Sequence, residues 1–243
     1  MEGTEDRNAA IWESAEVVDT WVAAAGERDA KRLAQWQLMA HLLPFEEDDA
    51  FLAADLGAGI GAAARAILAT YPKARVILTD FSSKMIEEGT RALQTYEGRF
   101  EYVRFDMEHE EWPPGLPSGL DAVVTSMCVH HLSDERKQAL FGEIHGHLAP
   151  GGWYLNYDPV RADDPVVEEA WRRAGDRLDP EAAHKREHLS PLEQARHENH
   201  VRHMVPLERQ VGFLRAAGFE AVDVFWKHLE NVIYGGRRPP ASG

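Results

Sequence analysis

Between residues 51 and 160, short apolar runs alternate with longer segments of helical periodicity, and this alternation constrains the fold more than any other feature. The runs that we predict as strands are 51–54, 75–78, 101–105, 120–126 and 153–157. The run at 120–126 is almost continuously apolar, as expected for a strand that is covered on both faces. Strands that alternate with helices favour a parallel sheet with helices on both faces, so we predict an α/β fold.

The segments that flank this alternation have a different character. Residues 1–50 have helical periodicity and are predicted to form an N-terminal helical cap on a domain that spans 51–243. Residues 161–205 are highly charged and helical in pattern, and we predict an insertion or lid, because 45 residues bury little core alone. The chain closes with a predicted helix and two strands, at 207–217, 221–229 and 231–234. The short link between the two strands indicates an antiparallel hairpin at the end of the sheet.

Composition excludes several classes of protein. The 243 residues hold 26 Lys and Arg against 41 Asp and Glu, a net charge of −15, so binding to a nucleic acid phosphate backbone is disfavoured. The single cysteine, Cys128, excludes an intramolecular disulfide and a cysteine-rich zinc module. We see neither an apolar run of about twenty residues nor a signal-like start, so we expect no membrane contact and a cytoplasmic location.

A glycine-rich turn, Asp55-Leu56-Gly57-Ala58-Gly59-Ile60-Gly61, joins the first predicted strand to the first following helix. Glycines let the backbone turn sharply and let a ligand approach it, and the helix start adds free N–H groups. The turn therefore indicates a nucleotide-type site at the carboxyl ends of parallel strands. The same residues also match the dinucleotide pattern, and Asp80 could accept ribose hydroxyls in either case, so NAD stays open as the ligand at this point.

Six segments in this order resemble class I S-adenosylmethionine-dependent methyltransferases. They are Asp55–Gly61, Leu78–Ser82, Phe105–Met107, Leu120–Leu132, Leu148–Gly152 and Ala217–Phe219. The resemblance covers 51–160 and 207–238, and the ending around 210–239 resembles a broad bacterial subgroup that acts on small molecules. It implies a Rossmann-like parallel sheet with a C-terminal antiparallel hairpin, and S-adenosyl-L-methionine as the cofactor.

The resemblance also implies a set of cofactor-binding residues, namely Asp55, Gly57, Gly59, Gly61, Asp80, Phe81, Asp106, Met107 and Ser126. Asp55 would help to hold the ammonium group, and Asp80 would bind the ribose. Asp106 would bond the adenine amino group. The turn from Asp55 to Ala64 lacks Lys and Arg, which fits a cofactor without phosphate.

Methyl transfer from a sulfonium is an in-line displacement, so a protein chiefly positions the acceptor and sometimes removes a proton. Candidate groups follow the fourth and fifth predicted strands. We predict His131, His130 and Asp158 as catalytic residues and Tyr157 as a substrate contact. A structural histidine bonded to a loop carbonyl is the alternative for either imidazole.

The predicted insertion contains five histidines, His184, His188, His197, His200 and His203. Their spacing places them along one side of a helix, a pattern that zinc could use. No acidic or cysteine partner has matching motif spacing, so we predict no metal site. We predict instead that His200 and Arg202 contact substrate from a lid, with solvated helix faces as the alternative.

These observations predict an enzyme that transfers a methyl group from S-adenosylmethionine to a small-molecule acceptor at oxygen or nitrogen. Three alternatives stay open: an S-adenosylmethionine-utilising enzyme of tRNA wobble-uridine modification, a catalytically inactive cofactor-binding protein, and an NAD-dependent oxidoreductase. Trp12 and Trp21 could serve either as a roof over the site or as the seam of a homodimer.

Overall fold

The structure is a computed structural model that describes residues 12, 14–108 and 112–241. The part of the predicted cap before residue 12 lies outside the described residues. Within the part described, no helix combines the length and the apolar character needed to cross a bilayer.

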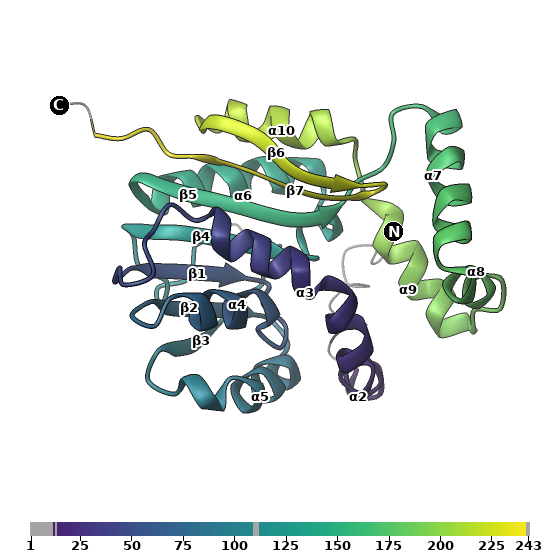
Figure 1. Ribbon diagram of the computed structural model, residues 1–243, viewed down its shortest axis with the longest axis horizontal. Helices are drawn as coiled ribbons and strands as arrows, with labels where there is room; N and C mark the ends of the chain where they lie inside the picture. Colours follow the sequence, from purple (N-terminus) through teal and green to yellow (C-terminus); the bar gives the residue numbers. More distant parts are fainter. Residues whose placement is uncertain (1–11, 13, 109–111, 242–243) are drawn as a thin grey trace, which may run out of the picture.

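Seven strands form one sheet in the order β3-β2-β1-β4-β5-β7-β6 (Figure 1). The strands are β1 (Leu52–Leu56), β2 (Arg75–Asp80), β3 (Phe100–Arg104), β4 (Leu120–Ser126), β5 (Leu148–Pro159), β6 (Glu220–His228) and β7 (Asn231–Arg237). The first five are parallel, and β7 enters antiparallel between β5 and β6. The predicted parallel sheet with a terminal antiparallel hairpin is confirmed.

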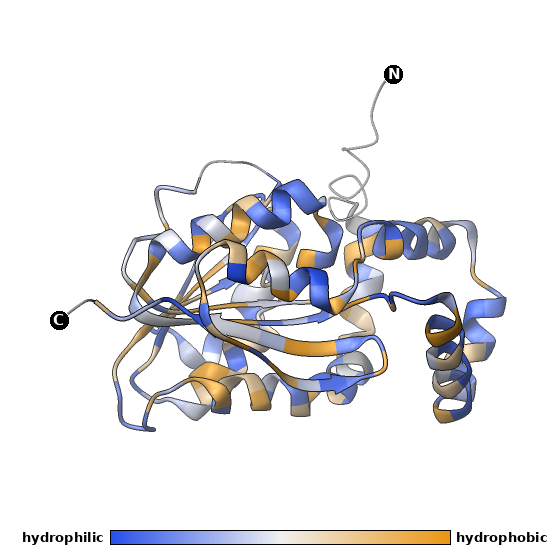
Figure 2. Ribbon diagram, turned by 90° about the horizontal axis from the view of Figure 1, so that it is seen from above, coloured by the Kyte–Doolittle hydropathy of each residue, from blue (hydrophilic) through white to orange (hydrophobic). Residues whose placement is uncertain are grey.

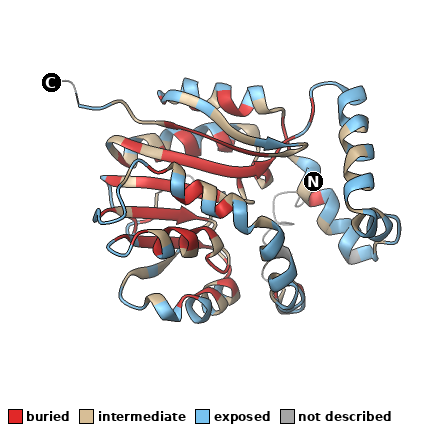
Figure 3. Ribbon diagram, viewed as in Figure 1, coloured by how far each residue is buried: buried red, intermediate tan, exposed pale blue. Residues whose placement is uncertain are grey.

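Helices cover both faces of this sheet. The helices of the described residues are α2 (Ala15–Ala23), α3 (Ala25–Leu42), α4 (Ala62–Thr70), α5 (Ser83–Ala92), α6 (Asp134–His147), α7 (Pro165–Leu178), α8 (Pro180–Glu187), α9 (Pro191–Arg202) and α10 (Leu207–Ala216), of which α7, α8 and α9 lie beside the sheet and not on its faces (Figure 1). Successive side chains of β1 point to opposite faces, so Ala53 joins the cluster packed by α3 and α4, whereas Ala54 joins the cluster packed by α6 and α10. Burial is therefore concentrated in the central strands and the inner sides of these helices (Figure 3).

The fifth strand is longer than the sequence pattern predicts. It begins at Leu148 and runs through Gly151 and Gly152, where the sequence suggested only a break. A Cβ atom at Gly152 would lie 2.9 Å from the carbonyl oxygen of Ala149 and 3.0 Å from that of Leu120. Glycine therefore lets the chain stay close to β4, and the register shift after Leu120 absorbs the irregularity.

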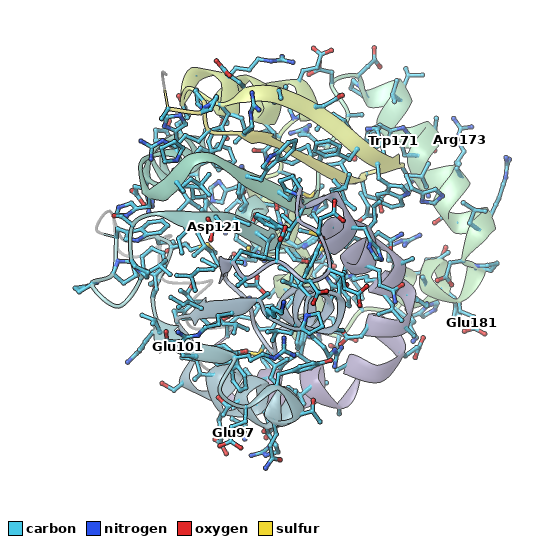
Figure 4. All side chains as sticks on the ribbon, turned by 60° about the vertical axis from the view of Figure 1, so that its left-hand side comes forward. Glu97, Glu101, Asp121, Trp171, Arg173 and Glu181 are labelled. Atoms are coloured by element: carbon cyan, nitrogen blue, oxygen red, sulfur yellow. The ribbon has the colours of Figure 1, made fainter. Side chains whose placement is uncertain are left out.

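The insertion forms three helices, α7, α8 and α9, beside the end of the sheet where β1 and β4 terminate (Figures 1 and 2). None of the residues of α7 and α8 is buried. Trp171 of α7 lies beside the β6–β7 hairpin (Figure 4), with Lys227 Nζ 4.2 Å from the centre of its ring. Asp179 Oδ2 lies 3.0 Å from Lys31 Nζ of α3. Of the three helices, α9 packs against the turn Val129–His131 that follows β4.

Candidate active site

A cavity opens at the carboxyl ends of β1, β2 and β4, beside the turn that joins β1 to α4. Eight predicted cofactor-binding residues line it: Asp55, Gly57, Gly59, Asp80, Phe81, Asp106, Met107 and Ser126. In Figure 1 the arrows of the parallel strands end on the side of the molecule where α2 and α9 lie. The sheet thus brings residues that are distant in sequence to one site, as expected for the carboxyl edge of parallel strands.

Gly61 is the predicted cofactor residue that does not line this cavity. It begins α4 with φ of +79°, and a Cβ atom there would lie 2.7 Å from Leu93 Cδ1 and 3.0 Å from Leu78 Cδ2. Its glycine character therefore lets α4 start close to the sheet. The prediction that Gly61 faces the ligand does not fit this geometry.

Asp55 ends β1 as a buried carboxylic acid that is 1% exposed. Its Oδ2 accepts a hydrogen bond from the Ala64 N–H at 3.0 Å, whereas Oδ1 has no partner among the described residues. Burial raises the pKa of Asp55 to about 7, although the Ala64 hydrogen bond acts in the opposite direction. An unpaired buried carboxylate oxygen of this kind is an acceptor available to a ligand.

Asp80 holds the glycine turn in place. Its Oδ2 accepts from the Gly59 N–H at 2.8 Å, and its Oδ1 accepts from the Ser82 N–H at 2.9 Å. Burial raises the pKa of Asp80 to about 6, and these backbone hydrogen bonds oppose the rise. Each carboxylate oxygen has a second lone-pair direction, so Asp80 can also accept from ligand hydroxyls.

Gly57 of the turn lies directly against two side chains of the cavity wall, Met107 and Cys128. Its φ is +65°, and a Cβ atom would lie 2.7 Å from Met107 Cε and 3.0 Å from Cys128 Cβ. The missing side chain leaves backbone exposed to whatever occupies the cavity.

The N-terminal helices supply three tryptophans to the wall of this cavity, Trp12, Trp21 and Trp36. Trp36 Nε1 donates to Ser126 Oγ at 2.7 Å. The rings of Trp12 and Trp21 are packed edge to face, with their centres 5.6 Å apart. Sequence reasoning did not assign Trp36 to the site, because an apolar residue on a helix face gives the same signal whether it packs the core or lines a cavity.

A second cavity, of about 490 Å³, adjoins the first. Both are lined by Trp12, Trp21, Arg32, Met127 and His131. The second is closed by polar side chains of α9, including Arg196, His197, Asn199 and His200. The insertion therefore supplies a polar wall to this second cavity, which we call the chamber.

Three histidines converge on this chamber. His130 Nδ1 lies 2.7 Å from Asp158 Oδ1, and both side chains are at most 1% exposed. The His130 ring centre lies 4.0 Å from that of His131 and 4.4 Å from that of His200. Burial raises the pKa of Asp158 to about 7 and lowers the pKa of His130 and of His200 to about 3. Burial likewise lowers the pKa of His131, so all three rings are uncharged at neutral pH.

A comparison with known protein families identifies the kind of domain to which the sheet and its glycine-rich turn belong. Residues 53–152 match the family model described as "Methyltransferase domain". Residues 53–152 therefore form a methyltransferase domain. The matched residues include the turn after β1, the ends of β2 and β3, and His130 and His131. The resemblance noted from the sequence is confirmed.

Similar proteins extend this finding. Over 118 residues, or 49% of this chain, the sequence is 30% identical to trans-aconitate 2-methyltransferase of Azoarcus, and the match spans 43% of that relative. The chain therefore corresponds to less than half of the relative's length. An O-methyltransferase family protein of Burkholderia thailandensis has the same fold, with a TM-score of 0.67 and 16% identity over 97% of this chain and 64% of its own. Human N-acetylserotonin methyltransferase, solved with S-adenosylmethionine, gives a TM-score of 0.65 at 17% identity over 98% of this chain and 60% of its own.

The residues that line the first cavity fit S-adenosylmethionine, the ligand with which human N-acetylserotonin methyltransferase was solved. The unpaired Asp55 Oδ1 suits the ammonium group, Asp80 suits the ribose hydroxyls, and Asp106 lines the same cavity with a carboxylate that could accept from an adenine amino group. Gly57 and Gly59 present backbone to the cavity, where the methionine part could lie.

Two residues that we predicted to contact the substrate, Tyr157 and Arg202, lie outside both cavities. Tyr157 is buried and packs against Trp226, with ring centres 6.1 Å apart, because alternation along β5 points it to the face opposite Asp158. Arg202 is exposed at the end of α9. Arg196 and His200 are four residues apart, so both lie on the side of α9 that faces the chamber. Arg202 does not lie on that side.

We expect Gly57→Ala to weaken binding of S-adenosylhomocysteine, the demethylated cofactor, by up to about 30-fold. An L-residue held at positive φ costs about 1–2 kcal/mol, and relief of that strain moves backbone that the cofactor contacts. Calorimetric titration measures the change. Gly142→Ala is the control, because nothing lies within 4 Å of a Cβ atom there. Equal affinities for the two variants would contradict the assigned role of Gly57.

We expect affinity for S-adenosylhomocysteine to rise on the order of tenfold between about pH 5.5 and about pH 7.5. The pKa of Asp55 is about 7, so below that pH the carboxyl carries a proton that must leave before an ammonium binds. Methylthioadenosine, which lacks the ammonium group, is the control and should show a smaller rise, set by Asp80 with its pKa of about 6. If the affinities for the two ligands rose equally with pH, the assignment of Asp55 to the ammonium group would be wrong.

Proposed function

We propose that this protein transfers a methyl group from S-adenosylmethionine to an oxygen or nitrogen of a small-molecule acceptor that binds in the second cavity. The observation that carries the proposal is the wall shared by the two cavities, which includes Arg32 and His131. An acceptor in the chamber would therefore lie next to the cofactor, as an in-line displacement requires.

The charge of the chamber favours an acceptor that carries a carboxylate. Arg32 and Arg196 line it against one carboxylate, that of Glu193, whereas the protein as a whole has a net charge of −15, so the chamber differs in charge from the rest of the protein. Arginine binds carboxylates through paired N–H groups. The Azoarcus relative is named for trans-aconitate, itself a carboxylate.

The bound cofactor would supply an electrophilic methyl group on a sulfonium. The residues of this chain would hold its ends through Asp55, Asp80 and Asp106, and Trp12 and Trp21 would exclude water from the reacting groups.

Proton removal depends on the acceptor atom. A carboxylate is already ionised at neutral pH, so it needs no base, and His131 would only orient it. A hydroxyl would give its proton to His131, which the neighbouring His130–Asp158 pair would position. Burial lowers the pKa of His131, so its ring is a weak proton acceptor, and this favours the acceptor that needs no base.

The first experiment is calorimetric titration with S-adenosylmethionine, S-adenosylhomocysteine and NAD, followed by a screen of di- and tricarboxylates for formation of S-adenosylhomocysteine. Binding of the first two ligands and turnover of a carboxylate are expected. Binding of NAD alone would support the oxidoreductase alternative, and turnover of neutral phenols in preference to acids would overturn the carboxylate class.

We expect Arg196→Gln to raise the KM for a carboxylate acceptor about tenfold, because a hydrogen bond to a charged group contributes about 1.5–3 kcal/mol. Arg196 lines only the second cavity, so affinity for S-adenosylhomocysteine should stay unchanged. Arg202→Gln, on the same helix but outside the chamber, is the matched control and should change KM less than about twofold. Equal effects of the two substitutions would argue against the chamber as the acceptor site.

A further inference from the structure

His130, His131 and His200 form a cluster that the sequence did not indicate as a unit. The first two come from the turn after β4, and the third comes from α9 of the insertion. Each offers one ring nitrogen, and the three nitrogens lie within 4.8 Å of one another. The expectation that no metal binds rested on spacing within the insertion alone, which does not reveal partners outside it.

His130 is held as a metal ligand is usually held. A carboxylate behind an imidazole fixes the proton on the near nitrogen and leaves a lone pair on the far one. Asp158 Oδ1 does this at 2.7 Å from His130 Nδ1. The far nitrogen, Nε2, is buried and has no hydrogen-bond partner among the described residues. A buried nitrogen without a partner costs free energy unless a ligand occupies the site.

Asn199 can play a corresponding part for His131. Its side-chain amide lies 3.3 Å from His131 Nδ1. The amide oxygen and nitrogen are interchangeable by a rotation, and with the oxygen towards the ring Asn199 accepts the Nδ1–H proton. His131 could then offer its other ring nitrogen to a metal.

We propose that His130, His131 and His200 bind one divalent transition-metal ion of the zinc type, with Asp158 orienting His130. Imidazole nitrogens favour zinc, cobalt, nickel or iron over magnesium and calcium. Three protein ligands leave one coordination position open, and these histidines all line the second cavity, so that position would face the acceptor chamber.

The present spacing of the three nitrogens is compatible with a single bound ion. Tetrahedral zinc, with bonds of about 2.0–2.1 Å, holds its nitrogens about 3.4 Å apart, less than the 4.8 Å limit within which they now lie. His200 is the ligand able to approach, because it belongs to the insertion and His130 and His131 belong to the sheet edge.

This proposal concerns metal binding and does not depend on methyl transfer. In a metal-loaded protein the ion would hold an oxygen of the acceptor, and His131 would serve as its ligand and not as a base. The positive charge of the ion, next to Arg32, would further favour an anionic acceptor.

A second group of potential ligands provides a control. His184, Glu187 and His188 also have ligand atoms within 4.8 Å of one another, but all three are exposed on or beside α8. They lack a buried unpaired nitrogen, so any metal that they bind would be adventitious.

The test is titration of the chelator-treated full chain with Co²⁺, followed by visible absorption and by equilibrium dialysis. We expect one tightly bound ion per chain in a histidine environment, with competition by Zn²⁺. The variant His200→Ala should weaken binding by more than about 100-fold, and Asp158→Asn should weaken it by about 10–100-fold. The double variant His184→Ala/His188→Ala should bind as the unchanged protein does.

Three outcomes would overturn the proposal: no tight binding by the unchanged protein, binding unaffected by His200→Ala, or binding lost only in the double variant, which would reveal an adventitious ion only. Affinity for S-adenosylhomocysteine, measured on every variant, reports whether the domain is folded. Intact cofactor binding without metal binding would reject the metal site and leave the proposed methyl transfer standing.

Discussion

Replacing Asp80 by alanine is expected to weaken binding of S-adenosylmethionine by about 1,000-fold, equivalent to about 4 kcal/mol. The carboxylate accepts from the Gly59 and Ser82 N–H groups at 2.8 and 2.9 Å, so its loss leaves two donors unpaired and frees the glycine turn. It also removes the acceptor for the ribose hydroxyls. Each such bond to a charged group contributes about 1.5–3 kcal/mol, so two or more together account for the effect.

Two further variants separate positioning from direct contact. Asp80→Asn keeps the shape but presents an amide N–H to one of the two backbone donors, so most of the affinity should still be lost. Asp106→Ala removes one contact to adenine and leaves the glycine turn intact, so it should cost only about tenfold. Thermal unfolding without ligand checks that each variant folds. An Asp80→Ala protein that binds within tenfold of the unchanged one would show that the cofactor lies elsewhere.

The residues predicted to bind the cofactor could be placed together from the sequence because the pattern that reveals them is local. Asp55, Gly57 and Gly59 form one continuous turn, and Asp80 ends the next strand, so strand order alone brings them together. Gly61 belongs to the same turn, yet it serves packing against Leu78 and Leu93. A glycine pattern shows that space is needed but not whether a ligand or a neighbouring helix uses it.

The acceptor chamber could not be predicted in the same way, because it forms only when the insertion folds back. His200 meets His130 across 70 residues of sequence, and Arg32 reaches the same chamber from α3. Nothing in the local pattern distinguishes Arg196, which lines the chamber, from Arg202, which does not. The difference is rotation about the helix axis, and it becomes visible only once the face of α9 that packs against the turn after β4 is known.

Replacing Asn156 by leucine is expected to lower the free energy of unfolding by about 3 kcal/mol. Asn156 lies in β5 beneath the site, where Thr125 Oγ1 donates to its Oδ1 at 2.8 Å and its Nδ2 donates to Tyr234 Oη at 2.7 Å. Tyr154 lies 2.7 Å from Thr125 Oγ1, so the four polar side chains join β4, β5 and β7 in one buried network. Leucine has a similar size but leaves Tyr234 Oη without its donor and removes one of the two hydrogen bonds of Thr125 Oγ1, each at a cost of about 1–3 kcal/mol.

Thermal and denaturant unfolding measure this effect, and for a chain of this length about 3 kcal/mol corresponds to a fall in Tm of roughly 6–12 °C. Tyr234→Phe is the graded control, since it removes one end of the network and leaves the bond between Thr125 and Asn156, so it should cost about half as much. The parallel strands carry the cofactor turn and the antiparallel β7 closes the sheet beside them, so the network joins the two parts of the sheet on which both cavities depend. If Asn156→Leu changed stability by less than about 1 kcal/mol, the strands would be held by apolar packing alone and the network would contribute specificity without stability.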